Sequence, residues 1–308
     1  MSQTIGPVTT QKGPVCFAGG VGPVYGPGTQ SFVLDLLSSY PTVAFSVRHL
    51  TANPLYVRPY CMLVRRSSDN ATLNIGYVNG LLDIVSLLAF CGSGNGYVVT
   101  WYNQGSLGSS GDATQSTAAS QPQVCASGVV TTKNGVPAIR FTGTNVALNS
   151  YKFAAPSTNF CASIIASSDS LSTADVLGND GAGAAINGLF GQLDTNSLWA
   201  FSRNAVVQSV TAGNPTANTL CINRIVHTSA NAATAFFNGV AGSQVTGLNW
   251  TAGANSNFTL GYYSNATAFS LIGYESEVIY WLTNIGPADA ATYDLNAAQF
   301  YGITGVTQ

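Results

Sequence analysis

The chain has 308 residues, enough to bury a large hydrophobic core as one β domain or two smaller ones. Only 7% of its residues are charged, and ten Lys and Arg scattered among twelve Asp and Glu leave no basic stripe that would indicate nucleic-acid binding. No apolar run approaches membrane-spanning length, and the first twenty residues lack the pattern of a signal peptide. We therefore expect a protein made in the cytoplasm, with neither membrane insertion nor nucleic acid as a partner.

The missing charge is replaced by Ser, Thr, Asn and Gly. A neutral polar surface with a net charge of −2 repels copies of itself only weakly. This composition favours a surface that other subunits cover, and we expect a homo-oligomer, with a trimer as the first choice. The alternative is a secreted β protein rich in Thr and Asn.

The six cysteines are spread singly along the chain, without any CxxC pair. This spacing disfavours zinc, and their placement in strand-like runs predicts reduced, buried thiols. Asp180 in a Gly-rich loop is a single carboxylate, which makes a poor calcium site. We therefore expect neither a metal nor a cofactor.

Residues 1–40 are predicted to form an extended N-terminal arm, and residues 41–308 one β-sandwich domain. The first thirty residues carry repeated Gly-Pro pairs, which suit neither a helix nor a central strand, and have almost no charge. Such an arm fits docking on a neighbouring subunit, whereas a passive tail is the alternative. Residues 31–39 resemble a short helix inside this arm.

The next elements are predicted between residues 43 and 102. Residues 43–50 form a strand or a helix, residues 61–66 and 73–77 a strand pair, and residues 97–102 a buried strand rich in β-branched and aromatic side chains. Apolar residues at helical spacing predict a helix over residues 82–90, which Gly92 ends.

From residue 123 onward, short strands separated by turn residues are typical of a sandwich or barrel. The predicted strands are 123–126, 137–141, 160–166, 188–193, 197–201, 206–210, 219–227, 234–237, 258–263 and 272–282. Asn238-Gly239 between apolar runs predicts a hairpin. A helix is expected over residues 288–300.

Two short motifs carry a family resemblance. The sequence RRSSDN at residues 65–70, followed by WYNQ at residues 101–104, resembles the catalytic domain of fungal-type α-L-arabinofuranosidase B proteins. Virion proteins of tailed phages carry the same block, usually without a demonstrated activity. The resemblance implies that the RRSSDN turn belongs to the scaffold, with Asp69 closing an Asx turn and an arginine paired to a nearby carboxylate.

The C-terminal half resembles laminin-G and concanavalin A-like lectin domains. The resemblance is carried by FNGV at residues 237–240, GYESEVIY at residues 273–280 and YGI at residues 301–303. It implies an all-β, concanavalin A-like/laminin-G-like antiparallel β-sandwich with a few short helices. A fold of this kind does not by itself define a ligand.

Retaining glycosidases need two carboxyl groups about 5 to 5.5 Å apart on either side of one sugar. In the arabinofuranosidases the nucleophile is a mid-chain glutamate near adjacent cysteines, but the only glutamates here are Glu275 and Glu277 near the C-terminus. Residues two apart on a strand share a face, with side chains that point in parallel, so this pair lacks the opposed geometry. Asn103 also stands where the family usually has Asp. We expect no catalytic residues.

Sugar binding requires exposed aromatic platforms beside polar groups. The candidates are Trp199, Trp250, Tyr262, Tyr263 and Asn265. Our first hypothesis is a non-enzymatic phage virion protein, a head decoration or a tail or fibre component, with other virion proteins as partners and host-surface glycans as candidate ligands. The alternatives are a glycoside hydrolase related to the α-L-arabinofuranosidases and a free lectin-like module.

Overall fold

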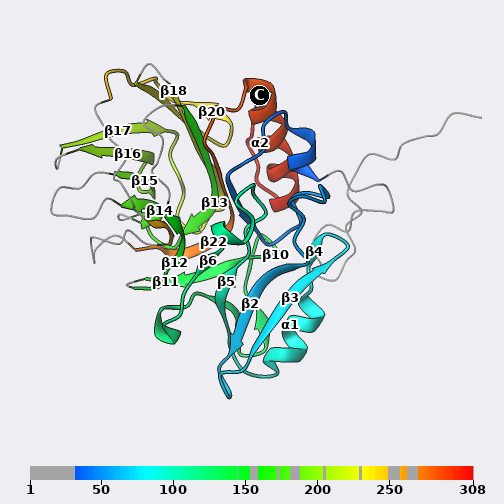
Figure 1. Ribbon diagram of the computed structural model, residues 1–308. Coiled ribbons are helices and arrows are strands. Elements are labelled where there is room, and N and C mark those ends of the chain that lie inside the picture. Colours follow the sequence, from blue (N-terminus) through cyan, green and yellow to red (C-terminus); the bar gives the residue numbers. More distant parts are fainter. Residues whose placement is uncertain are drawn as a thin grey trace, which may run out of the picture. The chain divides into compact units, whose positions relative to one another are not determined.

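The computed structural model describes residues 32–143, 145–152, 159–171, 174–180, 188–203, 206–228, 231–248, 257–261 and 270–307 (Figure 1). All of them belong to one folded unit, Ser31–Gln308. The predicted arm is too long at its C-terminal end, because Val33 and Leu34 are buried in the core of this unit. The helix expected over residues 31–39 is one short 3₁₀ turn, Val33–Leu36.

Strands dominate the described part of the chain. In its first half they are β1 (Val43–Ser46), β2 (Tyr60–Arg66), β3 (Thr72–Val78), β4 (Leu81–Leu82), β5 (Gly96–Trp101), β6 (Ala113–Thr114), β7 (Gln123–Ala126), β8 (Val129–Val130), β9 (Thr132–Lys133), β10 (Val136–Pro137), β11 (Ile139–Thr142) and β12 (Leu148–Lys152). The later strands are β13 (Phe160–Ser168), β14 (Ala174–Asp180), β15 (Gly188–Leu193), β16 (Ser197–Arg203), β17 (Val206–Ala212), β18 (Cys221–Thr228), β19 (Ala232–Phe237), β20 (Val240–Ala241), β21 (Asn257–Leu260) and β22 (Ile272–Trp281). The α-helices are α1 (Ile84–Cys91) and α2 (Pro287–Tyr301); the 3₁₀ turns at Gly108–Gly111 and Ala118–Ser120 complete the set.

The strands pair antiparallel and form an all-β sandwich, as predicted (Figure 1). One layer runs β19–β18–β13–β22, with β1 and β11 sharing the other edge of β22. The second layer runs β3–β2–β5–β6–β12–β21–β14–β15–β16–β17. Strand β7 links the two, because it pairs with both β5 and β11.

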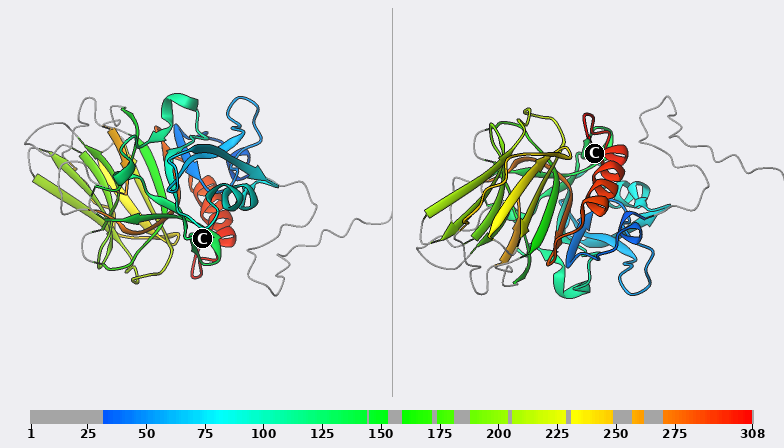
Figure 2. Two further views of the ribbon diagram at one scale, coloured as in Figure 1. Left: turned by 90° about the horizontal axis from the view of Figure 1, so that it is seen from below. Right: turned by 90° about the horizontal axis from the view of Figure 1, so that it is seen from above.

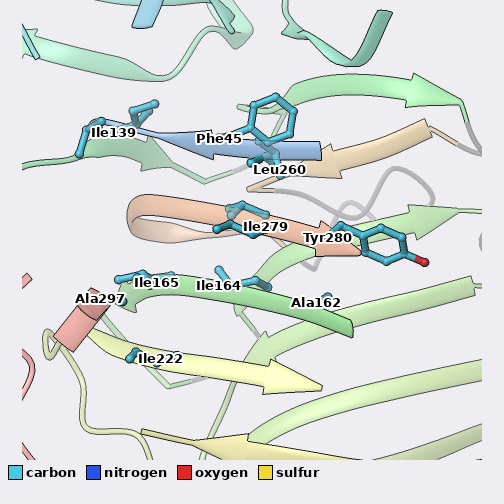
Figure 3. Packing of buried hydrophobic residues seen from close by; sticks show 14 of the residues in the cluster. Phe45, Ile139, Ala162, Ile164, Ile165, Ile222, Leu260, Ile279, Tyr280 and Ala297 are labelled. Atoms are coloured by element: carbon cyan, nitrogen blue, oxygen red, sulfur yellow. The ribbon is translucent and has the colours of Figure 1, made fainter. Parts of the chain in front are cut away.

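Strand β22 organises the first layer. Its ten residues pair with β13 along most of their length, and residues 275–281 are all buried. Helix α2 covers the side of this layer that faces away from β14–β17, as the views in Figure 2 show. The Trp281 ring packs edge-on against Tyr293 of α2, with centroids 5.7 Å apart. Figure 3 labels core residues from β1, β11, β13, β18, β21, β22 and α2.

A β-bulge interrupts β22 at its two glutamates. Glu277 pairs with Ile165 and Glu275 with Ala166, so two steps along β22 correspond to one step along β13. Neighbouring residues of a strand point to opposite faces, and the bulge therefore sends the two carboxyl groups to opposite sides of the layer. The expectation that Glu275 and Glu277 share one face of the strand is wrong. Because their carboxyl groups lie on opposite sides of the layer, the two cannot act on one sugar.

Local sequence signals set the ends of the helices and the hairpin. Asp83 caps α1 by accepting a hydrogen bond from the Ser86 amide (3.0 Å). Helix α2 begins at Pro287 and ends at Tyr301, and its C-cap residue Gly302 has a φ of 63°, which suits glycine. Asn238 and Gly239 both have positive φ, 49° and 83°, and close the predicted hairpin between β19 and β20.

Candidate functional site

The structure describes only one of the five predicted sugar-binding residues. Trp250, Tyr262, Tyr263 and Asn265 lie outside the described residues. Trp199 on β16 is fully buried, and its indole Nε1 donates a hydrogen bond to Asn223 Oδ1 (2.5 Å). The prediction of an exposed platform is therefore wrong for Trp199, which packs in the core because alternation along β16 points it inward.

Glu277 lies beneath α2 at the centre of a saturated hydrogen-bond network. Arg48 Nε and Nη2 donate to it at 2.9 and 3.2 Å, Tyr293 Oη donates at 2.9 Å, and Ser46 Oγ donates at 2.7 Å. The Tyr301 hydroxyl lies 3.0 Å from Oε2. Burial and the charge of Glu277 hold the pKa of both tyrosine hydroxyls far above its usual range, so they remain donors. This carboxylate has no capacity left for a substrate.

Glu275 lies on the other side of β22 and has the opposite environment. Its side chain is fully buried, and neither oxygen meets hydrogen-bond geometry with any described group. Burial raises the pKa of Glu275 well above its ordinary value, and the nearby Gly261 amide offsets this only in part. Burial therefore disfavours the charged form of Glu275, and this environment is poorly suited to a carboxylate nucleophile.

The other described carboxylates also serve the scaffold. Each accepts a hydrogen bond from a fixed partner: Asp35 from Thr51, Asp69 from Arg66, Asp83 from Ser86, Asp112 from Asn103, Asp169 from Arg140, Asp194 from Thr195, Asp289 from Ser38 and Asp294 from Arg224. The side chains of Asp175 and Asp180 are not among those described. Within the described part, no group of three or more His, Cys, Asp or Glu could hold a metal ion.

The RRSSDN turn is structural, as predicted. Arg66 grips both oxygens of Asp69 at 2.8 and 2.6 Å, and Asp69 Oδ1 also accepts from the Ala71 amide (3.0 Å). Arg65 donates to Gln121 and Asn70 at 2.7 and 2.8 Å. These two arginines are therefore engaged within the turn and its neighbours.

The WYNQ motif is also mostly structural. Trp101 is buried, and Asn103 accepts hydrogen bonds from the Ala44 and Gly105 amides at 2.7 and 2.8 Å. Asn103 Nδ2 donates to the Gly108 carbonyl (3.0 Å), a contact that an aspartate could not make. This contact explains why Asn suits the position where the arabinofuranosidases usually have Asp. Buried Gln104 accepts from the Leu50 amide (2.8 Å).

One row of side chains crosses the second layer from strand to strand. Successive cross-strand partners are Asn74, Leu63, Thr100, Thr114, Asn149 and Thr259. Cross-strand partners share a face, and Met62 and Trp101, on the opposite face, are fully buried in the core. Thr259 Oγ1 donates to Asn149 Oδ1 (3.1 Å). Five of the six residues in this row are polar, which is unlike the apolar core face.

A group of polar and aromatic side chains stands at the Asn74 end of this row. We call Arg58, Tyr60, Asn74, Tyr102 and Asp112 the Arg58 cluster. The Tyr102 hydroxyl donates to Asn74 Oδ1 (2.6 Å), and the Arg58 guanidinium lies 5.2 Å from the centre of the Tyr102 ring. Arg58 Nη2 pairs with Asp112 Oδ2 at 3.2 Å, and Tyr60 is 43% exposed. Aromatic surface beside hydrogen-bonding groups is the combination that sugars require.

The Arg58 cluster has no signature in the sequence that would identify it as a whole. Tyr102 was visible within WYNQ, but Arg58 and Asp112 are 54 positions apart and meet only through the fold. Asp112 is held by the Asn103 amide (2.9 Å), and its burial raises its pKa despite Arg58. The sequence feature that could have indicated the cluster is Tyr102, because it is the one WYNQ residue that alternation and loop geometry leave partly exposed.

The described helices include none that is both long and apolar enough to cross a bilayer. Among the cysteines, Cys61, Cys91, Cys125, Cys161 and Cys221 are buried free thiols, and Cys16 lies outside the described residues. Burial raises the pKa of Cys61, Cys161 and Cys221 to about 12, so these thiols remain protonated.

Comparison with known proteins gives structural likeness only. No protein-family model and no curated protein matches the sequence. A mutant GH54 α-L-arabinofuranosidase soaked with 4-nitrophenyl α-L-arabinofuranoside aligns with a TM-score of 0.63 at 13% identity, over 87% of this chain and 64% of that chain. An arabinofuranosidase complexed with arabinofuranosyl-α-1,2-xylobiose aligns with a TM-score of 0.64 at 14% identity over the same shares.

A sialidase from Trypanosoma rangeli aligns less closely, with a TM-score of 0.47 at 13% identity, over 65% of this chain and 31% of that chain. The present chain spans just under two thirds of the length of the arabinofuranosidase chains. At these identities the likeness concerns the fold alone. The protein shares the β-sandwich architecture found in arabinofuranosidases, which confirms the predicted resemblance at the level of fold.

Proposed function

We propose that this protein is a non-catalytic, glycan-binding β-sandwich carried on the surface of a phage particle. The observation that carries the proposal is the use of carboxylates. On a fold shared with a sugar hydrolase, Glu277 is saturated by the scaffold, whereas Glu275 lies on the opposite side of β22, where burial disfavours its charged form. A retaining mechanism requires two carboxyl groups facing one sugar, and the described side chains offer no such pair.

The Arg58 cluster, together with the exposed Thr114 of the neighbouring cross-strand row, supports glycan binding. Exposed Tyr60 offers a surface for the apolar face of a sugar ring, and Asn74 and Arg58 offer hydrogen-bonding groups beside it. The structurally similar arabinofuranosidases were solved with arabinofuranoside ligands, which supports the same ligand class for this fold.

The virion assignment is supported by the phage-like motifs and by the low charge. With only 7% charged residues, the surface resists association weakly, so copies of this chain and other virion proteins are the proposed partners.

Residues 1–30 are the proposed attachment arm, since their prolines reduce the entropy lost on docking. Their deletion should reduce the sedimenting oligomer or particle-bound fraction and leave the far-UV spectrum unchanged; an unaltered fraction would make the arm a passive tail.

The test of the main proposal combines an activity assay with a binding assay on the full chain. Incubation with 4-nitrophenyl α-L-arabinofuranoside should release no nitrophenol above the no-protein background, whereas a panel of immobilised glycans should retain the protein. Turnover that persists after purification to homogeneity would establish the hydrolase instead. Retention by no glycan would remove the binding function.

A further inference from the structure

Arg58 differs from every other arginine whose side chain the structure describes. The other five, Arg48, Arg65, Arg66, Arg140 and Arg224, each make at least two side-chain hydrogen bonds to described groups. Arg58 makes one, from Nη2 to Asp112 at 3.2 Å. A guanidinium has five N–H donors, so four remain without a partner among the described groups.

The position of Arg58 makes these donors usable. Its side chain is 21% exposed, and its guanidinium lies over the Tyr102 ring, which restricts its orientation. Tyr60, whose ring centre is 6.4 Å from that of Tyr102, and Asn74, bonded to the Tyr102 hydroxyl, flank the same ring. An under-used arginine is therefore held beside one exposed aromatic ring and one amide.

Asp112 does not satisfy this arginine. Its Oδ1 holds the Asn103 amide (2.9 Å), and the pKa of Asp112 stays above its ordinary value because burial outweighs the pairing with Arg58. A guanidinium group can bind a carboxylate through two parallel N–H···O bonds. Arg58 makes only one long hydrogen bond to Asp112 and therefore does not bind it in this two-bond geometry.

Building on the proposed glycan binding, we infer that the Arg58 cluster is a subsite for a carboxylated sugar, such as a uronic or sialic acid residue. The free N–H groups of Arg58 take the sugar carboxylate, the Tyr60 ring takes the apolar face of the pyranose, and Asn74 contacts a hydroxyl. The overall charge of −2 provides no general attraction for a polyanion, so recognition of the acid depends on this one arginine.

The test compares oligogalacturonate, its methyl ester, sialyllactose, a neutral arabino-oligosaccharide and a sulfated oligosaccharide by titration calorimetry on the full chain. At least one carboxylated sugar should bind more tightly than its neutral counterpart. Arg58→Met should weaken that binding by about 10- to 100-fold, the loss expected for a hydrogen bond to a charged group. Arg58→Lys should recover only part of it, because an ammonium lacks the fork.

Arg140→Met is the matched control. Arg140 is also partly exposed, at 20%, lies 4.8 Å from the Tyr274 ring centre and pairs with Asp169, but through two short bonds of 2.9 and 2.6 Å. Its removal should leave affinity for the carboxylated sugar unchanged. The methyl ester tests the same contact on the unaltered protein. This test therefore remains valid even if Arg58→Met does not fold.

Four results would overturn the subsite. Equal affinity for acid and ester, or an unchanged affinity in Arg58→Met, would exclude the carboxylate contact and leave glycan binding intact. Equal affinity for sulfated and carboxylated sugars would indicate recognition of charge rather than of a carboxylate. Binding of none of the five sugars would count against the subsite and the proposed function together.

Discussion

Two arginine–carboxylate pairs in this molecule have opposite properties. Arg48 and Glu277 lie beneath α2 with side chains 7% and 0% exposed, and tyrosine and serine hydroxyls complete the network. Arg58 and Asp112 lie near the surface, 21% and 13% exposed, with one bond of 3.2 Å between them. Both pairs are charged, but only the Arg48–Glu277 pair has its hydrogen-bonding groups matched by protein partners. An arginine whose donors are matched holds the fold, whereas one with unmatched donors is available to a ligand.

The energetic reason lies in desolvation. A buried ion pair is stable only when nearly every donor and acceptor is matched, because removing one partner leaves an uncompensated charge in a medium of low polarity. A pair near the surface keeps water as an alternative partner, and an incomplete set of hydrogen bonds costs little. Arg58 can therefore keep N–H donors without a protein partner at little cost, whereas the buried Arg48 cannot.

Glu277→Gln should have the largest effect, because it removes the charge that Arg48, Tyr293, Tyr301 and Ser46 surround. We expect a loss of about 3 to 5 kcal/mol in the free energy of unfolding, measured from denaturant midpoints at constant m-value. Asp69→Asn, in the exposed pair with Arg66, is the control and should barely move the midpoint. Equal losses in the two variants would show that the saturated, buried pair contributes no more to stability than the exposed pair.

Glu275→Met should have the second largest effect and the opposite sign. Replacing a buried polar group that has no hydrogen-bond partner among the described residues by an apolar side chain of similar shape should stabilise the protein by about 1 to 3 kcal/mol. The folded state keeps the Glu275 proton above the ordinary glutamate pKa, whereas the unfolded state releases it. The wild-type protein therefore loses stability as pH rises through this interval, and the advantage of Glu275→Met should grow from pH 4 to pH 8.

The advantage of Glu275→Met is measured by urea unfolding at both pH values. A pH-independent difference between wild type and variant would mean that Glu275 is ionised in the folded protein. The side of β22 that faces the sandwich interior would then hold a charged carboxylate, as the α2 side does, and the two glutamates would not differ in their ionisation.

Asp112→Asn should have the smallest effect on stability, below about 1 kcal/mol, because the pair is near the surface and the new amide oxygen still accepts from the Asn103 amide. It should nevertheless strengthen binding of a carboxylated sugar, since it removes a like charge beside Arg58 and frees another N–H donor. The measurement is the affinity for oligogalacturonate, together with the melting temperature. Weaker binding in Asp112→Asn would show that Asp112 orients Arg58 for the ligand.

Features fixed by neighbouring residues were predicted from the sequence. The Asn238-Gly239 turn, the Asp69 turn and the end of α1 at Gly92 each depend on backbone preferences within a few positions. The overall sandwich followed from alternation and turn spacing. These signals are local, and tertiary contacts reinforce them rather than override them.

Features fixed by distant partners were not predicted. The bulge at Ser276 exists only because β22 pairs with β13, and it reversed the expected relation of Glu275 to Glu277. The sequence predicts a surface ring at Trp199, but the position of its strand in the sandwich buries it. The Arg58–Asp112 contact depends on the loops around β2 and β6 and has no signature in spacing.

The proton on Glu275 also affects how the molecule behaves in an electric field. The formal charge of −2 counts both glutamates as anions, but burial disfavours the charged form of Glu275, so the folded protein should carry less negative charge than this count wherever Glu275 keeps its proton and an ordinary glutamate loses it. With a formal charge of only −2, one proton is a large share of the total charge and should lower the electrophoretic mobility measurably. The native protein should therefore focus at a higher pH than the 5.5 calculated from its sequence, and unfolding should shift it back.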